Sequence, residues 1–169
     1  MEHLWAPWRM QYVAGEKAEC CIFCAVPGAP EEAGSHVLYR GEHNFVILNR
    51  FPYNSGHLMV VPYEHQHDLT ALSPAQLAEM MNIVQGVIEA YNCCLRPEGV
   101  NLGMNLGQAA GAGIDDHLHL HLVPRWCGDT NFMTAVGETR VVPQSLEDSA
   151  ALVGPVLREV MARRQAAEA

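Results

Sequence analysis

The sequence predicts an α+β domain with an antiparallel sheet of about five strands and two main helices. Three observations support this fold class. Short apolar segments separated by turn residues occupy residues 36–62, and a strictly alternating segment runs from residue 117 to 123. Two longer segments, beginning near residues 73 and 146, have the spacing of amphipathic helices. Strands followed by helices on one side favour an α+β domain.

The strands are predicted from apolar runs bounded by turn residues. Residues 36–40 and 45–49 form a predicted hairpin that turns at residues 41–43. Residues 57–62 read as a further strand after the Pro- and Gly-containing break that precedes them, and residues 100–106 as another.

The first helix is predicted to begin at Pro74, because Ser73 is a suitable N-cap and proline is favoured at the first helical position. Apolar residues then follow at helical spacing up to Tyr91, so this helix packs on an apolar surface. A last helix is predicted from about Leu146 to Arg164.

The composition fits one globular domain, residues 1–169. The chain has 169 residues, 49% of them apolar, which is enough for a hydrophobic core. No apolar run reaches the roughly 18 residues that a membrane span needs. Residues 1–9 lack the basic start and apolar stretch of a signal peptide, so we expect a cytoplasmic protein without a membrane partner.

The charge argues against a nucleic-acid polymer as partner. The formal net charge is −9, and no basic patch is visible in the sequence. A small anionic ligand stays compatible with this charge, because backbone N–H groups and a few side chains can hold a phosphate.

Three histidines, His117, His119 and His121, alternate with three leucines. In a strand this alternation places the leucines on one face and the imidazoles on the other. Same-face neighbours are about 6.5–7 Å apart, so His117 and His121 are roughly 13 Å apart at their Cα atoms. The three rings therefore cannot all ligate one metal ion, and we expect divided roles with one ring at a reacting centre.

Residues 117–123 match the His-φ-His-φ-His-φ-φ motif, where φ is apolar, and thereby resemble the histidine triad superfamily of nucleotide hydrolases and transferases. Residues 49–62 resemble the upstream segment of the same family, and the similarity covers roughly residues 20–130. Residues 4–10 and 124–133 look like those of bacterial members described as diadenosine tetraphosphate phosphorylases. Residues 1–20 and 130–169 are then extensions specific to that subfamily.

The resemblance implies an enzyme with three catalytic histidines. The family residue that matches His119 is the nucleophile that attacks the α-phosphorus of a nucleotide and becomes a nucleotidyl-histidine. This chemistry suits a neutral imidazole near pH 7. The match of His57 helps to orient the active site, and His121 is expected to serve the phosphate or leaving group as an acid or hydrogen-bond donor.

The resemblance also implies a set of substrate contacts. Asn49 matches a family position near the nucleotide sugar, where many relatives carry Asp, and the other contacts are near the phosphates or leaving group. Many relatives place a hydroxyl residue where this chain has Ile114, and backbone N–H groups of the glycine-rich loop are expected to replace it. The implied contacts are Asn49, Asn105, Gly107, Gln108, Gly111 and Gly113.

Residues 21–24 form a C-x-x-C sequence, for which redox chemistry, zinc binding and chance compete on spacing alone. Some histidine triad proteins use such a pair with two histidines to bind Zn²⁺ as a structural cofactor. Cys20 and His67 are rival ligands, and unligated thiols are the alternative. Mg²⁺ is a further cofactor that can accompany a polyphosphate substrate. The ligands implied by the resemblance are Cys21, Cys24, His65 and His117.

The function implied is nucleotidyl transfer from a dinucleoside polyphosphate, with diadenosine tetraphosphate as the expected substrate. Phosphate as acceptor would give ATP and ADP, and water would give AMP and ATP. The alternatives are a nucleoside phosphoramidate hydrolase and a nucleotide-binding signalling module. A metal oxygenase with a cupin-like barrel is disfavoured by the two long helices. The family dimerises by joining sheets, so a homodimer or higher homo-oligomer is expected.

Overall fold

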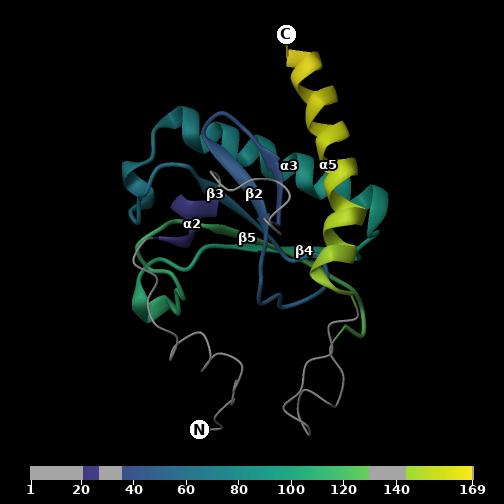
Figure 1. Ribbon diagram of the computed structural model, residues 1–169, viewed down its shortest axis with the longest axis horizontal. Coiled ribbons are helices and arrows are strands. Elements are labelled where there is room, and N and C mark those ends of the chain that lie inside the picture. Colours follow the sequence, from purple (N-terminus) through teal and green to yellow (C-terminus); the bar gives the residue numbers. More distant parts are fainter. Residues whose placement is uncertain (1–20, 27–35, 130–143, 169) are drawn as a thin grey trace, which may run out of the picture.

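The computed structural model describes residues 21–26, 36–129 and 144–168, and its strands form one five-stranded sheet (Figure 1). The strand order is β1-β2-β3-β5-β4, and each neighbouring pair is antiparallel. The α+β prediction is therefore confirmed. The strands are β1 Val37–Arg40, β2 Asn44–Leu48, β3 Leu58–Pro62, β4 Gly99–Gly103 and β5 Leu120–Arg125.

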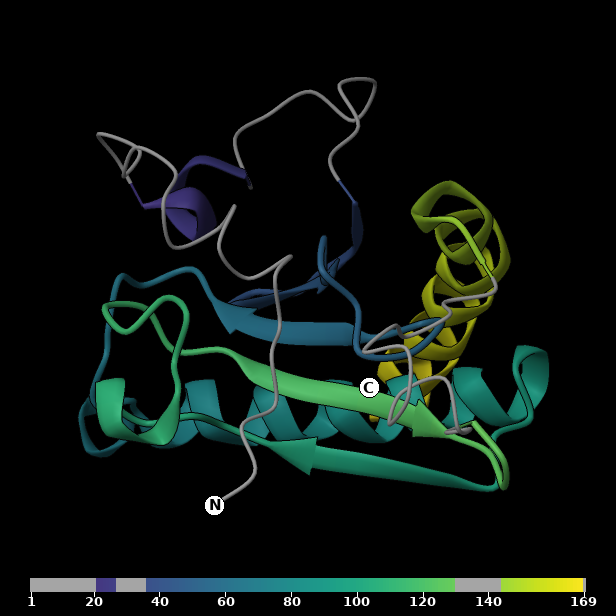
Figure 2. The same cartoon turned by 90° about the horizontal axis from the view of Figure 1, so that it is seen from below.

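Two long helices cover one face of the sheet, and a short one lies on the other (Figure 2). Ser73 caps α3 as predicted: its side chain accepts from the Gln76 N–H, and the Gln76 side chain accepts from the Ser73 N–H. The last helix extends beyond the predicted Arg164. The helices are α2 Ile22–Ala25, α3 Pro74–Cys94 and α5 Leu146–Glu168, with 3-10 turns η2 Leu69–Ala71 and η3 Gln108–Ala110.

The histidine strand starts later than its alternation predicts. β5 pairs with β3 only as far as Leu120, opposite Val60, whereas the alternation predicts a strand from His117. Beyond that point the Leu118 N–H donates instead to the Gln66 carbonyl, at 2.7 Å. The extended backbone still alternates, because Leu118 is buried in the same core as the later leucines. Likewise the predicted strand 100–106 ends at Gly103, where the pairing of β4 with β5 ends at His121.

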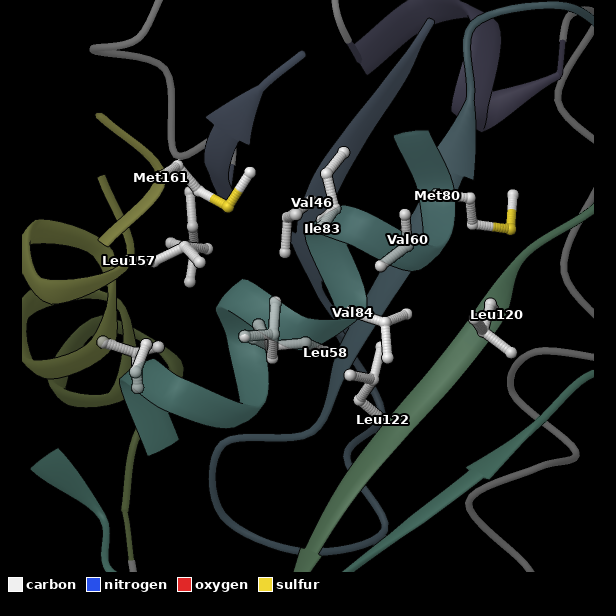
Figure 3. Packing of buried hydrophobic residues seen from close by; sticks show 14 of the residues in the cluster. Val46, Leu58, Val60, Met80, Ile83, Val84, Leu120, Leu122, Leu157 and Met161 are labelled. Atoms are coloured by element: carbon white, nitrogen blue, oxygen red, sulfur yellow. The ribbon is translucent and has the colours of Figure 1, made fainter. Parts of the chain in front are cut away.

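The two faces of the sheet have separate apolar cores. On the helix-covered face, Leu120 and Leu122 pack with Leu58, Val60 and residues of α3 and α5 (Figure 3). On the opposite face, a smaller cluster gathers around α2. This arrangement confirms that the leucines and histidines of the alternating segment point to opposite sides. The smaller cluster consists of Phe23, Phe45, Ile47, Met59 and Val61.

The structure describes only part of the two predicted extensions. Residues 1–20 lie outside the described residues. The C-terminal extension is described from residue 144, and its helix α5 packs against α3 and β1, with Leu157 and Met161 in the larger core. Among the described helices, none has the length and apolar character needed to cross a membrane.

Tyr91 of α3 links the helix to the segment that carries His57. Its side chain is fully buried, and its hydroxyl donates to the carbonyl oxygen of Gly56 at 2.6 Å. Gly56 has φ +75°, and a Cβ there would lie 2.7 Å from Cδ1 of Leu95. A glycine is therefore needed at the turn that places His57 in front of β3.

Replacing Tyr91 by Phe should destabilise the fold, because the buried Gly56 carbonyl loses this donor. We expect the free energy of unfolding to fall by about 1–3 kcal/mol, the usual cost of an unsatisfied buried polar group, in urea titrations. Tyr39→Phe is the control, since the Tyr39 hydroxyl accepts from Gln165 at the surface. Its loss should stay within about 0.5 kcal/mol, and equal losses in both variants would contradict this interpretation.

Candidate active site

The three predicted catalytic histidines lie in one row on the face of the sheet opposite α3 and α5. His57 precedes β3, His119 directly precedes β5, and His121 is the second residue of β5. The ring centroids of His119 and His121 are 4.8 Å apart, and those of His57 and His121 are 5.1 Å apart. His57 is fully buried and His119 is nearly so, whereas His121 is partly exposed.

The hydrogen bond of His119 identifies its free ring nitrogen. Nδ1 of His119 lies 2.9 Å from the carbonyl oxygen of His117. A carbonyl oxygen can only accept, so Nδ1 carries the hydrogen and the neutral ring keeps its lone pair on Nε2. A nucleophilic imidazole needs this arrangement.

A second pair of hydrogen bonds defines the state of His121. The backbone N–H of Tyr53 donates to Nδ1 of His57 at 3.0 Å. A neutral His57 therefore carries its hydrogen on Nε2, which lies 3.0 Å from Nδ1 of His121. Because that Nδ1 accepts, His121 carries its own hydrogen on Nε2. His121 is thus a neutral donor beside the free nitrogen of His119.

The environment keeps these rings neutral. Burial, followed by the nearby His121 and His119, lowers the pKa of His57 to about 3. Burial and the nearby His119 lower the pKa of His121 to about 4. Burial also lowers the pKa of His119, although its bond to the His117 carbonyl acts in the opposite direction. All three imidazoles are uncharged near pH 7, and a neutral His119 retains the lone pair that attack on phosphorus requires.

The four residues implied as metal ligands form one cluster beside this row. Their ligand atoms all lie within 4.8 Å of one another. Sγ of Cys21 is 3.3 Å from Nδ1 of His117, and Sγ of Cys24 is 3.3 Å from Nδ1 of His65 and 3.7 Å from Nδ1 of His117. The rival His67 is exposed and lies outside the cluster, and Cys20 lies outside the described residues.

The donor set and its spacing fit a tetrahedral zinc ion. Zinc–sulfur bonds of about 2.3 Å and zinc–nitrogen bonds of about 2.0–2.1 Å imply sulfur–nitrogen separations of roughly 3.5 Å. Nε2 of His117 donates to the Pro62 carbonyl at 2.9 Å, which directs the lone pair of Nδ1 into the cluster. Among the described residues, only this group brings three or more histidine, cysteine, aspartate or glutamate side chains close enough to share one ion.

The predicted substrate residues are placed at different distances from the histidine row. Nδ2 of Asn49 lies 3.5 Å from Nδ1 of His57, and its Oδ1 accepts from the Phe51 N–H. Asn105 lines a pocket of about 330 Å³ together with His121, Tyr53 and Asn101. Asn49 and Asn105 therefore flank the row.

The glycine-rich segment is exposed and makes its own local contacts. Gly107 and Gly111 have φ values of +80° and +83°, at either end of η3. The Gln108 amide donates to Asp115 at 2.7 Å. Gly113 is exposed. In this structure the Gln108 side chain is therefore directed at Asp115.

Several residues of the site were missed by sequence reasoning. The Phe23 ring packs against both His117 and His119, with centroids 5.4 Å and 5.2 Å away. The Tyr53 ring lies 4.6 Å from that of His57. The only signal for Phe23 was its place inside the C-x-x-C sequence, and for Tyr53 its place shortly before His57.

Arg125 lines the pocket beside His121, and the Asp129 carboxylate balances its charge. Nε and Nη2 of Arg125 both donate to the Asp129 carboxylate, at 2.6 Å and 2.8 Å. Nη1 of Arg125 donates to Oδ1 of Asn101 at 2.9 Å. The bidentate pair joins the turn after β5 to the end of that strand, and the bond to Asn101 joins Arg125 to β4.

Known proteins resemble this chain in sequence and in fold. A family model described as the HIT domain matches residues 30–127. A protein of Mycobacterium tuberculosis named AP-4-A phosphorylase is 40% identical over 162 residues, which cover 90% of this chain and 83% of that protein.

The structure of a Zn-bound histidine triad family protein from Mycobacterium smegmatis has a TM-score of 0.67 and 32% identity, covering 85% of this chain and 96% of that one. A hypothetical histidine triad nucleotide-binding protein from Sulfolobus tokodaii has a TM-score of 0.65 and 26% identity, covering 85% and 93%. The family model and the M. tuberculosis relative together show that this chain belongs to the HIT domain family, the histidine triad family that its sequence resembles.

Proposed function

We propose that the protein transfers a nucleotidyl group from diadenosine tetraphosphate through a covalent intermediate on His119. The observation that carries this proposal is the hydrogen bond from Nδ1 of His119 to the His117 carbonyl, which leaves a neutral Nε2 beside the donor His121. The name of the 40% identical M. tuberculosis relative, AP-4-A phosphorylase, supports this choice of substrate.

In the first step, Nε2 of His119 attacks the α-phosphorus of one adenosine. A nitrogen–phosphorus bond forms, the bond from phosphorus to the bridging oxygen breaks, and ATP leaves. The ring already carries the hydrogen on Nδ1, so the His117 carbonyl accepts a hydrogen bond from the positively charged nucleotidyl-imidazole. This stabilises the charge that develops as the bond forms.

His121 and His57 would act on the leaving oxygen. Nε2–H of His121 is the donor for the negative charge that develops on that oxygen, and His57 holds His121 in the required tautomer. Asn49 and Asn105 flank this row and are the proposed contacts to sugar and phosphate. Gly107, Gln108, Gly111 and Gly113 are proposed to close over the phosphates from the exposed loop.

In the second step, an acceptor oxygen attacks the same phosphorus and releases His119. Phosphate as acceptor gives ADP, and water gives AMP. Splitting one displacement into two in this way is the usual advantage of covalent catalysis.

The proposal is tested by incubating the pure protein with diadenosine tetraphosphate, with and without phosphate and with and without Mg²⁺, and by separating the nucleotides. We expect ATP in every case, and ADP only when phosphate is present. His119→Ala should lower kcat/KM by roughly a thousandfold or more, as loss of a nucleophile does. His67→Ala, at an exposed histidine outside the row, is the matched control.

Two outcomes would contradict this function. One is a His119→Ala variant with the activity of the His67→Ala control. The other is a protein that leaves diadenosine tetraphosphate intact but cleaves adenosine 5′-phosphoramidate, which would favour the phosphoramidate hydrolase hypothesis instead.

We also propose that Cys21, Cys24, His65 and His117 bind one structural Zn²⁺ ion. The convergence of two thiols and two imidazoles supports this, as does the description of the M. smegmatis relative as Zn-bound. Bound zinc would hold both cysteines as thiolates and tie α2 to the sheet. A reducing compartment suits such thiols, so a cytoplasmic location belongs to the same proposal.

Metal analysis after extensive dialysis tests the zinc site. Wild-type protein should retain one zinc ion per chain, and Cys24→Ser should retain much less and melt at a lower temperature. Cys93→Ser, at an exposed cysteine outside the cluster, should behave as wild type. Wild-type protein that is free of zinc after expression with ample zinc, or equal zinc in both variants, would refute the site.

We propose further that two copies of the chain join through β4. This strand is at one edge of the sheet (Figure 2), and four of its five residues are exposed. An exposed edge strand offers unpaired backbone groups to another strand. Leu102 adds an apolar side chain that is 46% exposed.

Sedimentation velocity at micromolar concentration tests this assembly. The wild-type protein should sediment as a dimer or larger homo-oligomer, and Leu102→Asp should shift it towards the monomer because a charge then lies at the joined edge. Leu152→Asp, at an exposed leucine of α5, should leave the assembly unchanged. A monomeric wild-type protein would refute the proposal.

A further inference from the structure

The short helix α2 is held against the sheet by few side chains. It has four residues, Ile22–Ala25, and no side chain caps its N-terminus. One helical turn is not stable by itself in water, because the cost of nucleation exceeds the gain from its few hydrogen bonds. Its position must therefore come from tertiary contacts, chiefly those of Cys21, Phe23 and Cys24.

Phe23 is the part of α2 that reaches the catalytic row. Only 2% of its surface is exposed, and it packs in the apolar cluster with Phe45 and Met59. Its ring lies edge-on to His117 and tilted by 43° to His119, with centroids 5.4 Å and 5.2 Å apart. Phe23 thus contacts both one residue of the Cys/His cluster and the nucleophile candidate.

Phe23 restricts rotation of the His119 ring by packing against it, in addition to the hydrogen bond at Nδ1. The His119 ring donates from Nδ1 to the His117 carbonyl and packs against the rings of His121 and Phe23. A ring flip about the Cβ–Cγ bond would exchange Nδ1 with the opposite carbon and redirect Nε2. Close packing against Phe23 opposes such a movement, because a neighbouring aromatic ring fills the space that the flip needs.

We propose that Phe23 is a positioning residue through which metal binding at Cys21, Cys24, His65 and His117 controls the orientation of His119. When the metal holds both cysteines, α2 is fixed and Phe23 is pressed against the nucleophile. Without the metal, α2 keeps the apolar packing of Phe23 but loses the attachment through both cysteines, so Phe23 confines the His119 ring less tightly. The consequence for turnover rests on the proposed nucleotidyl transfer and the coupling rests on the proposed zinc site, whereas the packing of Phe23 against the His119 ring rests on neither.

The test compares Phe23→Ala, Phe23→Leu and Ile22→Ala with the wild-type protein, each loaded with zinc and each after chelation. Ile22 is the matched control because it lies on the same helix with 45% of its surface exposed. Zinc per chain, the proton and nitrogen NMR signals of the His119 ring, and kcat and KM are measured for every sample.

We expect zinc-loaded Phe23→Ala to keep its metal, to lose the ring-current shift on the His119 protons, and to lose roughly ten- to a hundredfold in kcat with little change in KM. Phe23→Leu should recover part of kcat, and Ile22→Ala should match wild type. Chelation should move the His119 signals of the wild-type protein in the same direction as Phe23→Ala does. In Phe23→Ala, chelation should cause little further change in the His119 signals or in kcat, because the coupling residue is already missing.

Two results would overturn the inference. Unchanged His119 signals and kcat in zinc-loaded Phe23→Ala would show that Phe23 does not position the ring. Equal effects of chelation in the wild type and in Phe23→Ala would show that the metal acts through His117 alone. If Phe23→Ala fails to fold or to hold zinc, the same two comparisons are made with Phe23→Leu. A wild-type protein without turnover would refute the proposed function, while the NMR comparison would still decide the coupling.

Discussion

The register of β5 between β3 and β4 is the constraint on which the site depends. His121 lies opposite Met59 on one side and opposite Gly103 on the other, so the strand is held by neighbours on both edges. Side chains alternate with a period of two, and a shift of one residue would bury the imidazoles among the helices and expose the leucines. The apolar core under α3 and α5 therefore fixes where every histidine of the row points.

The point where β5 stops pairing with β3, at Leu120, matters as much as the register of β5. Beyond it, the His117 carbonyl accepts the Nδ1 hydrogen of His119 at 2.9 Å. The backbone of this stretch is held by other means: the Leu118 N–H donates to the Gln66 carbonyl, and Nε2 of His117 donates to the Pro62 carbonyl. Residues 117–121 thus carry a candidate metal ligand, a candidate nucleophile and a candidate hydrogen-bond donor, because the first of them lie outside the sheet and the last two belong to β5.

Local sequence patterns predicted the five strands and the two long helices but not α2, and contacts between distant residues had to come from the structure. The alternation of histidine and leucine predicted the two faces of β5, and Ser73-Pro74 predicted the start of α3. The start of β5 at Leu120 was not predictable, because beyond it the Leu118 N–H donates to the distant Gln66 carbonyl instead of continuing the ladder with β3. Spacing alone also could not select His65 over His67, since the cluster joins segments that are 41 and 96 residues apart. The contact of Phe23 with His119 also joins distant segments, so sequence spacing could not predict it.

Covalent nucleotidylation of His119 can be detected by trapping the intermediate. Protein mixed with diadenosine tetraphosphate in the absence of phosphate is quenched with base within milliseconds to seconds, since a phosphorus–nitrogen bond is stable to base. Intact and peptide masses are then measured. We expect a mass increase of one adenylyl group, located on His119 and lost when phosphate is added before the quench. An adenylyl group on another residue, or turnover without any adduct, would contradict it.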